Sequence, residues 1–204
     1  MRFFCTSSFS TTGVIREMNA IIGSIDAEYR RYKALAEAAL EQVPEASLST
    51  PGPSGGNSLA IICWHVSGNL QSRFTQFLDS DGEKPWRQRE EEFAARTVSR
   101  DDLQAKWAMG WDVLLDTLGT LTDADLARSV VIRGRSLTVH EALHRSLAHT
   151  SYHVGQIVYL AHMIQGADWH FLSIPPGGSA AYNADPRLDK PAEQAGALRA
   201  KPAR

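Results

Sequence analysis

The sequence predicts an all-α protein in which four long amphipathic helices form a four-helix bundle. Two observations support this fold class. Apolar residues recur every three or four positions over four separate stretches of the 204-residue chain, which is the spacing of one helix face. The one clearly alternating segment, SVVIRGRSLTV, is short, so a sheet is expected to contribute little.

The first two helices are predicted in the N-terminal half of the chain. The first runs from about Thr12 to Gln42 and stops before Pro44. Ser, Thr, Pro and Gly dominate residues 47–56, which predicts a loop. A second apolar periodicity then predicts a helix from about Asn57 to Asp79.

Capping residues mark the other two helices. The third is predicted to begin near Ser99, a good N-cap, and to continue to about Leu118. The fourth is predicted to begin at Thr138, because Thr138 and Glu141 have the spacing of a capping box. It ends before Gly166, a residue type that commonly terminates helices.

The connections and the chain ends complete the predicted organisation. The segment SVVIRGRSLTV predicts a short hairpin before the last helix, and residues 82–98 are long enough for a crossover that returns the chain along the bundle. Residues 1–11 form an N-terminal extension, and residues 12–182 form the bundle. Residues 183–204 contain almost no large apolar side chains, so we expect a disordered tail.

Composition excludes several classes of protein. The length suits one domain with a real core. A formal net charge of −2 argues against a nucleic-acid partner or a membrane surface as partner. Two cysteines provide no disulfide framework, and the N-terminus lacks the continuous apolar region of a signal peptide. We therefore expect a cytoplasmic protein.

The most informative motif is a pair of histidines four residues apart in the fourth helix. This spacing places His149 and His153 one above the other on a face that is otherwise core-like. Two buried imidazoles need polar partners, and one divalent cation satisfies both. His65 lies among apolar residues of the second helix and is the candidate third ligand. Three neutral nitrogen ligands with open positions are typical of a catalytic metal site.

Alternatives to the metal site remain open at this point. A single histidine is more often a satisfied polar residue, and we keep that interpretation for His144 and His162, which fall on other faces of the same helix. No catalytic residue can be assigned.

Several other side chains could contact a ligand or a substrate. Asn69 and Gln156 lie on the same helix faces as the histidines, where they could hydrogen-bond a ligand or simply join two helices. Arg87 and Arg89, with Trp86, could form a clamp for carboxylates, because arginine binds a carboxylate in a bidentate fork. The alternative, which we favour, is a solvated loop in which these cations pair with Glu90–Glu92. Trp169 could form an apolar wall.

Two sequence blocks resemble the DinB-like (YfiT-like) superfamily of metal-dependent enzymes, in particular a branch without an assigned function. They are NSLAIICWHVSGNLQSRFTQFLDSDGEKPWRQREEEF and HTSYHVGQIVYLAHMIQGADWHFLSIPPG, and the likeness spans roughly residues 16–183. The resemblance implies a four-helix bundle with a long crossover and a divalent metal, usually nickel or zinc. On the matching positions the ligands are His65, His149 and His153. Members with assigned activities include thiol-cofactor-dependent S-transferases and isomerases.

The resulting hypothesis is a thiol-dependent S-transferase that acts on small electrophiles with a low-molecular-weight thiol. The inner helix faces offer few carboxylates that could serve as a general base, and a thiolate stabilised by a metal needs none. A metal-dependent hydrolase and a non-catalytic metal-binding bundle related to stress remain alternatives. Trp64, Trp107 and Trp111 are more large aromatics than one small bundle readily buries, so we also expect a homodimer.

Overall fold

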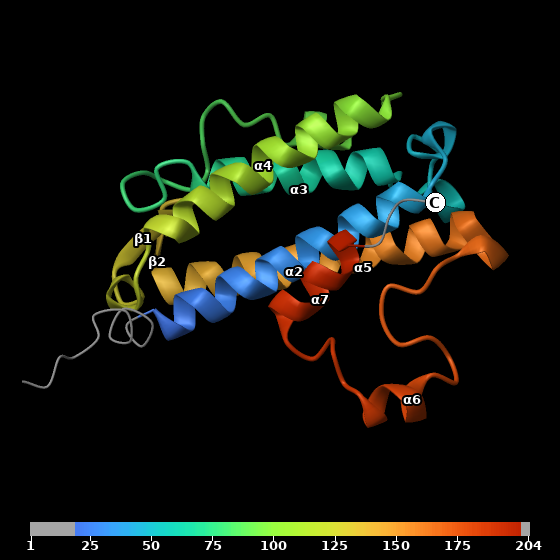
Figure 1. Ribbon diagram of the computed structural model, residues 1–204. Coiled ribbons are helices and arrows are strands. Elements are labelled where there is room, and N and C mark those ends of the chain that lie inside the picture. The colour runs from blue at the N-terminus through green and yellow to red at the C-terminus, as the bar shows by residue number, and fades with distance from the viewer. Residues whose placement is uncertain (1–18, 201–204) are drawn as a thin grey trace, which may run out of the picture.

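The computed structural model describes residues 19–200, and within them the chain is mostly helical (Figure 1). The four long helices are α2 (Ala20–Gln42), α3 (Leu59–Phe74), α4 (Arg100–Thr120) and α5 (Val139–Gln165). Two shorter ones follow, α6 (Ser179–Ala184) and α7 (Pro191–Ala200). Single 3-10 turns occupy Glu45–Ser47, Pro53–Gly55, Glu90–Phe93, Asp123–Asp125 and Gly166–Asp168. The all-α class is therefore confirmed.

The predicted capping residues occupy the helix ends. The Ser99 side chain accepts a hydrogen bond from the Asp102 backbone in a capping box that starts α4. Thr138 and Glu141 form the equivalent box at the start of α5, and Gly166 ends that helix with a φ of 56°. A left-handed φ of this kind favours glycine, which explains the position of the helix end.

The second helix is shorter than the sequence predicts. It ends at Phe74 rather than near Asp79, because Thr75 is extended and Gln76 has a φ of 49°. The apolar side chains Phe77 and Leu78 still pack on the core, so their periodicity continues past the point where the backbone leaves the helix. The predicted start of the first helix, residues 12–18, lies outside the described residues.

Hydrogen bonds at the helix ends fix the directions of the long helices. Helices α3 and α4 both begin near the C-terminal end of α2: the Ala60 N–H donates to the Leu48 carbonyl, and Arg100 donates to the Leu40 carbonyl. Both therefore run in the same direction, and residues 75–99 carry the chain back between them (Figure 1). The long crossover predicted for this region is present.

Helix α5 packs against α2, and these two helices are parallel to each other. The start of α2 lies near the end of α4, since the N–H groups of Ile21 and Ile22 donate to the Asp123 carboxylate at 3.0 and 2.9 Å. At the other end, Gln42 exchanges hydrogen bonds with the backbone of His170, just past α5. Two helix pairs result, α2 with α5 and α3 with α4 (Figure 1).

A two-stranded antiparallel hairpin precedes α5, as the sequence predicts. Strands β1 (Ser129–Ile132) and β2 (Arg135–Thr138) pair with Val130 opposite Leu137. Arg133 and Gly134 both have positive φ values in the turn. Their N–H groups donate to the Asp81 carboxylate at 2.8 Å each, so the crossover holds the hairpin in place.

The core is aromatic where the two helix pairs meet. Tyr29 is fully buried and makes edge contacts with Phe74 and Trp111, with ring centroids 6.5 and 6.3 Å apart. Trp107 is also buried, and the guanidinium of Arg96 covers the half-buried ring of Trp64.

The tryptophans that motivated the homodimer are therefore covered within one chain. A second copy is not required to bury them. The homodimer stays a prediction.

The C-terminal segment differs from the expected disordered tail. Residues 183–200 include the end of α6 and the whole of α7, and α7 packs along α2 (Figure 1). Ala195 and Leu198 are buried in this contact. Composition alone misses this helix, because two apolar side chains suffice for docking on a surface that the rest of the fold provides. Residues 1–11 and 201–204 lie outside the described residues.

None of the helices between residues 19 and 200 is long and apolar enough to cross a membrane.

Candidate metal centre

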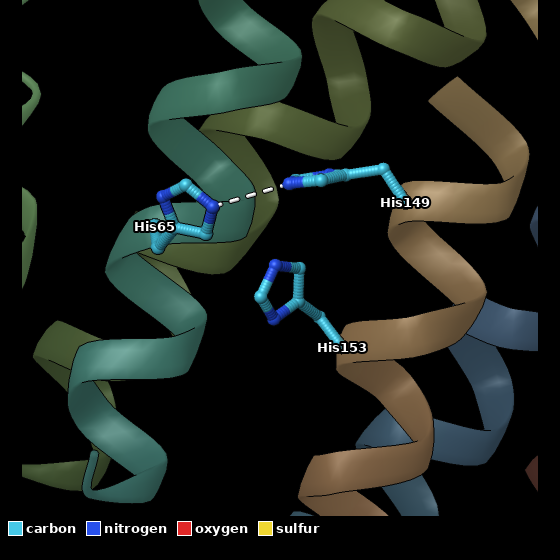
Figure 2. Close-up of side chains that lie close together, drawn as sticks. All are labelled: His65, His149 and His153. Atoms are coloured by element: carbon cyan, nitrogen blue, oxygen red, sulfur yellow. Dashed lines mark hydrogen bonds between the residues drawn. The ribbon is translucent and has the colours of Figure 1, made fainter. Parts of the chain in front are cut away.

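Three histidine side chains from two helices meet in the interior of the molecule. His65 extends from α3, and His149 and His153 extend from successive turns of α5 towards it (Figure 2). One ligand nitrogen from each lies within 4.8 Å of the others. The Nε2 atoms of His65 and His149 are 3.2 Å apart. His65 is buried, and the other two are half-buried.

The orientation of two of these rings is set by a second hydrogen bond. The Nδ1 atom of His65 lies 2.9 Å from the Glu92 carboxylate, and the Nδ1 atom of His153 lies 2.8 Å from the Gln156 side-chain oxygen. Carboxylate and amide oxygens accept hydrogen bonds, so each Nδ1 carries the hydrogen. The Nε2 atom of each neutral ring then has a free lone pair facing the cluster, as a metal ligand requires.

Glu92 is the central partner of this arrangement. Its side chain is 8% exposed and accepts two hydrogen bonds from Arg87, at 2.7 and 2.9 Å, in addition to the one from His65. Burial opposes its ionisation, but the hydrogen bonds from His65 and Arg87 hold the pKa of Glu92 below its usual value. The carboxylate therefore stays charged inside the protein.

Gly68 of α3 makes room for the Glu92 carboxylate. A Cβ atom on Gly68 would lie 2.2 Å from the Glu92 Oε1 atom, so any larger residue here would displace the Glu92 side chain from its present position. Gly68 follows His65 by three residues, so it lies on the same face of α3. The short 3-10 turn Glu90–Phe93 brings Glu92 into the space that this glycine leaves.

The surroundings favour the neutral form of His149 and His153. Burial lowers the pKa of His149 to about 3, with further contributions from His153, His65 and the positive charges of Arg87 and Arg73. Burial also lowers the pKa of His153, although its hydrogen bond to Gln156 acts in the opposite direction. Neutral imidazole is the form that binds metal ions, so these shifts favour coordination down to acidic pH.

The donor set fits a divalent cation. Nitrogen ligands of a tetrahedral zinc ion at about 2.05 Å would lie about 3.4 Å from one another. The 3.2 Å separation between His65 Nε2 and His149 Nε2 is close to this value. Three imidazoles suit zinc or nickel and leave positions for other ligands. His65, His149 and His153 could therefore hold a metal ion.

A cavity of about 170 Å³ adjoins two of the three histidines. His65 and His149 form part of its wall, together with three of the residues that the sequence suggested as ligand contacts: Asn69, Arg87 and Arg89. Gln156 instead holds His153.

The two tryptophans proposed as substrate contacts lie elsewhere. Trp86 is 54% exposed and does not line the cavity among the described residues. Trp169 is stacked on His162, with ring centroids 5.0 Å apart, near the end of α5. The structure does not bring either of them to the three histidines.

The solvated loop favoured from the sequence is wrong for Arg87 and Glu92. These residues do pair, but their side chains are only 2% and 8% exposed, and the pair supports His65. Sequence reasoning missed this role of Glu92 and Gly68. The run Glu90–Glu92 offers three equivalent carboxylates, and only the path of the crossover selects one of them.

The fold and the site define an all-α protein with a candidate three-histidine metal centre. Residues 17–178 match a family described as "Protein of unknown function (DUF1572)", and the chain belongs to that family. No curated protein and no solved structure matches the chain.

Removing one histidine should empty the site. We expect His153→Ala to lower the affinity for zinc or nickel by at least about tenfold, because one of three ligands is lost. His144→Ala is the matched control: His144 is exposed on the same helix, outside the cluster. Metal content of the purified proteins and competition with a chromogenic chelator provide the measurement. Equal affinities in the two variants would contradict the assignment.

Neutralising Glu92 should weaken the site without removing a ligand. Glu92→Gln can still accept a hydrogen bond from His65 but leaves Arg87 without its buried counter-charge. We expect metal affinity to fall by about 10- to 100-fold, the usual cost of disturbing a residue that orients a ligand. Glu90→Gln, at a neighbour whose side chain is 87% exposed, should bind metal as the unchanged protein does. Indistinguishable affinities for these two variants would show that Glu92 does not orient His65.

The metal-free protein should lose stability on acidification. The pKa of His149 falls from an ordinary 6.5 to about 3 on folding, so the unfolded chain binds more protons between these pH values. Above pH 6.5 this contribution to stability is complete; below it, the free energy of unfolding decreases by at most about 1.4 kcal/mol per pH unit for each such histidine. Urea titrations over this range give the slope. His149→Gln should flatten it and His144→Gln should not; the opposite ranking would contradict the shift.

Proposed function

We propose that this chain is a divalent-metal-dependent enzyme of the DinB-like (YfiT-like) superfamily, folded as its four-helix bundle. The ligands are His65, His149 and His153, and the metal is nickel or zinc. The observation that carries the proposal is that one ring nitrogen of each of these residues lies within 4.8 Å of the others, beside a cavity large enough for part of a small molecule. Open metal positions next to a cavity are typical of catalytic rather than structural sites.

Thiol-dependent S-transfer is the chemistry that we assign to this site. Among the described residues no Asp or Glu lines the cavity, and Glu92 is already engaged by His65 and Arg87. Hydrolysis would need a general base to take a proton from water. A thiol ionises far more readily than water, and nearby arginines lower its pKa further.

Each residue of the site would have a separate role in the reaction. A divalent ion bound by the three histidines would stabilise the negative charge of a thiolate. The low-molecular-weight thiol releases its proton to solvent, its sulfur forms a bond to an electrophilic carbon of the substrate, and the leaving group departs with the electron pair of the broken bond. Asn69, on the cavity wall, is placed to hydrogen-bond either reactant. A cytoplasmic location remains a prediction.

Activity assays on metal-free and reconstituted protein test this function. We expect chlorodinitrobenzene and similar electrophiles to be consumed only when both the metal and a thiol such as glutathione, cysteine or coenzyme A are present. His153→Ala should lose this activity and His144→Ala should keep it. Circular dichroism of the metal-free protein verifies that the fold survives the loss of metal.

The other outcomes separate the alternatives. Thiol-independent hydrolysis of an ester or amide panel that disappears with the metal would replace the transferase by a hydrolase. Tight metal binding without either activity would identify a non-catalytic metal-binding bundle.

A further inference from the structure

The cavity beside the candidate metal centre is lined by arginines from separate parts of the chain. They come from α3, the crossover, the hairpin turn and α5, and they are Arg73, Arg87, Arg89, Arg133 and Arg145. Between residues 19 and 200 no carboxylate joins them on the cavity wall. A concave wall with charges of one sign concentrates the electric field inside it.

The neighbouring carboxylates neutralise only part of this charge. Arg73 and Arg133 share a single carboxylate, that of Glu83, at 3.2 and 2.8 Å. Arg87 forms an ion pair with Glu92, and the same carboxylate also accepts a hydrogen bond from His65. An excess of positive charge therefore remains around the cavity.

Two further arginines have little or no internal compensation. The partner of Arg89 is Glu90, which at 87% exposure is screened by solvent. Arg145 makes no ion pair or side-chain hydrogen bond within the described residues.

Arg87 supplies an independent indication of a missing acceptor. Its side chain is 2% exposed, and its Nη1 atom has no hydrogen-bond partner within residues 19–200. Leaving a buried donor on a charged group unpaired is costly. Since Arg87 lines the cavity, an oxyanion placed there would accept this hydrogen bond.

We infer that this cavity binds the anionic end of the substrate, a group with two negative charges such as a phosphate monoester or a dicarboxylate. Guanidinium groups match both oxyanions in geometry, and two charges suit the excess on the wall. The small cavity volume and the net charge of −2 favour a small molecule over a nucleic acid. The inference rests on the proposed function, for which it names the substrate class.

Calorimetric titration of metal-free protein with inorganic phosphate, malonate and acetate tests this inference. Removing the metal excludes direct ligation of the anion to it. We expect saturable binding of at least one dianion, about tenfold or more tighter than acetate, and weakening with added salt. Arg145→Gln should reduce the affinity for that dianion about tenfold, as expected for loss of a charged hydrogen bond. Arg128→Gln is the matched control, since Arg128 carries the same charge but pairs with Asp125 and does not line the cavity.

Each outcome decides for or against the anion site. Phosphate binding alone assigns a phosphate ester, and malonate binding alone assigns a dicarboxylate. Absence of dianion binding, or equal weakening by Arg145→Gln and Arg128→Gln, would overturn the inference. The titration measures binding without catalysis. A protein that binds the dianion but shows no transferase activity would therefore contradict only the proposed function.

Discussion

The buried carboxylate of Glu92 is the interaction on which the candidate site depends. It ties the crossover to α3 through His65 and is itself held by Arg87. A charge at this depth is tolerated because Arg87 pairs with it and His65 donates a hydrogen bond to it, and removing Arg87 would leave an uncompensated carboxylate in the interior. The same contact fixes which nitrogen of His65 faces the other histidines. The geometry of the candidate metal centre therefore depends on the position of the crossover.

This arrangement also explains why neutral and charged groups coexist in a small volume. Burial pushes His149 and His153 towards their neutral form, with a further contribution from Arg87 and Arg73 at His149, while Glu92 is kept ionised by the groups that donate to it. His65 joins the two kinds of group: its Nδ1 atom lies 2.9 Å from the Glu92 carboxylate, and its Nε2 atom lies 3.2 Å from His149 Nε2.

Local patterns in the sequence were sufficient to find the four long helices and the histidine pair. The capping residues Ser99 and Thr138 act through neighbours three positions away, and His149 and His153 share a face because of the helical repeat, so each can be inferred without the tertiary fold. The role of Glu92 depends on how the crossover folds over α3, and the docking of α7 depends on the surface that α2 presents to it. These contacts join segments far apart in the chain, and neither residue type nor spacing reveals them.

The parallel arrangement of α3 and α4 has a consequence for folding. Neighbouring helices joined by a tight turn can pair as soon as both have formed. Helices α3 and α4 can pair only after residues 75–99 have spanned the length of the helices and brought the start of α4 back to the start of α3. The two helices approach each other closely at Ser67 and Gly110, where a Cβ atom on Gly110 would come within 2.6 Å of the Ser67 backbone. Contacts of this kind join residues that are far apart in the sequence, so they raise the contact order of the chain, which is the mean sequence separation of contacting residues. Its folding is accordingly slower than that of a helical protein of equal size in which every neighbour is adjacent in sequence.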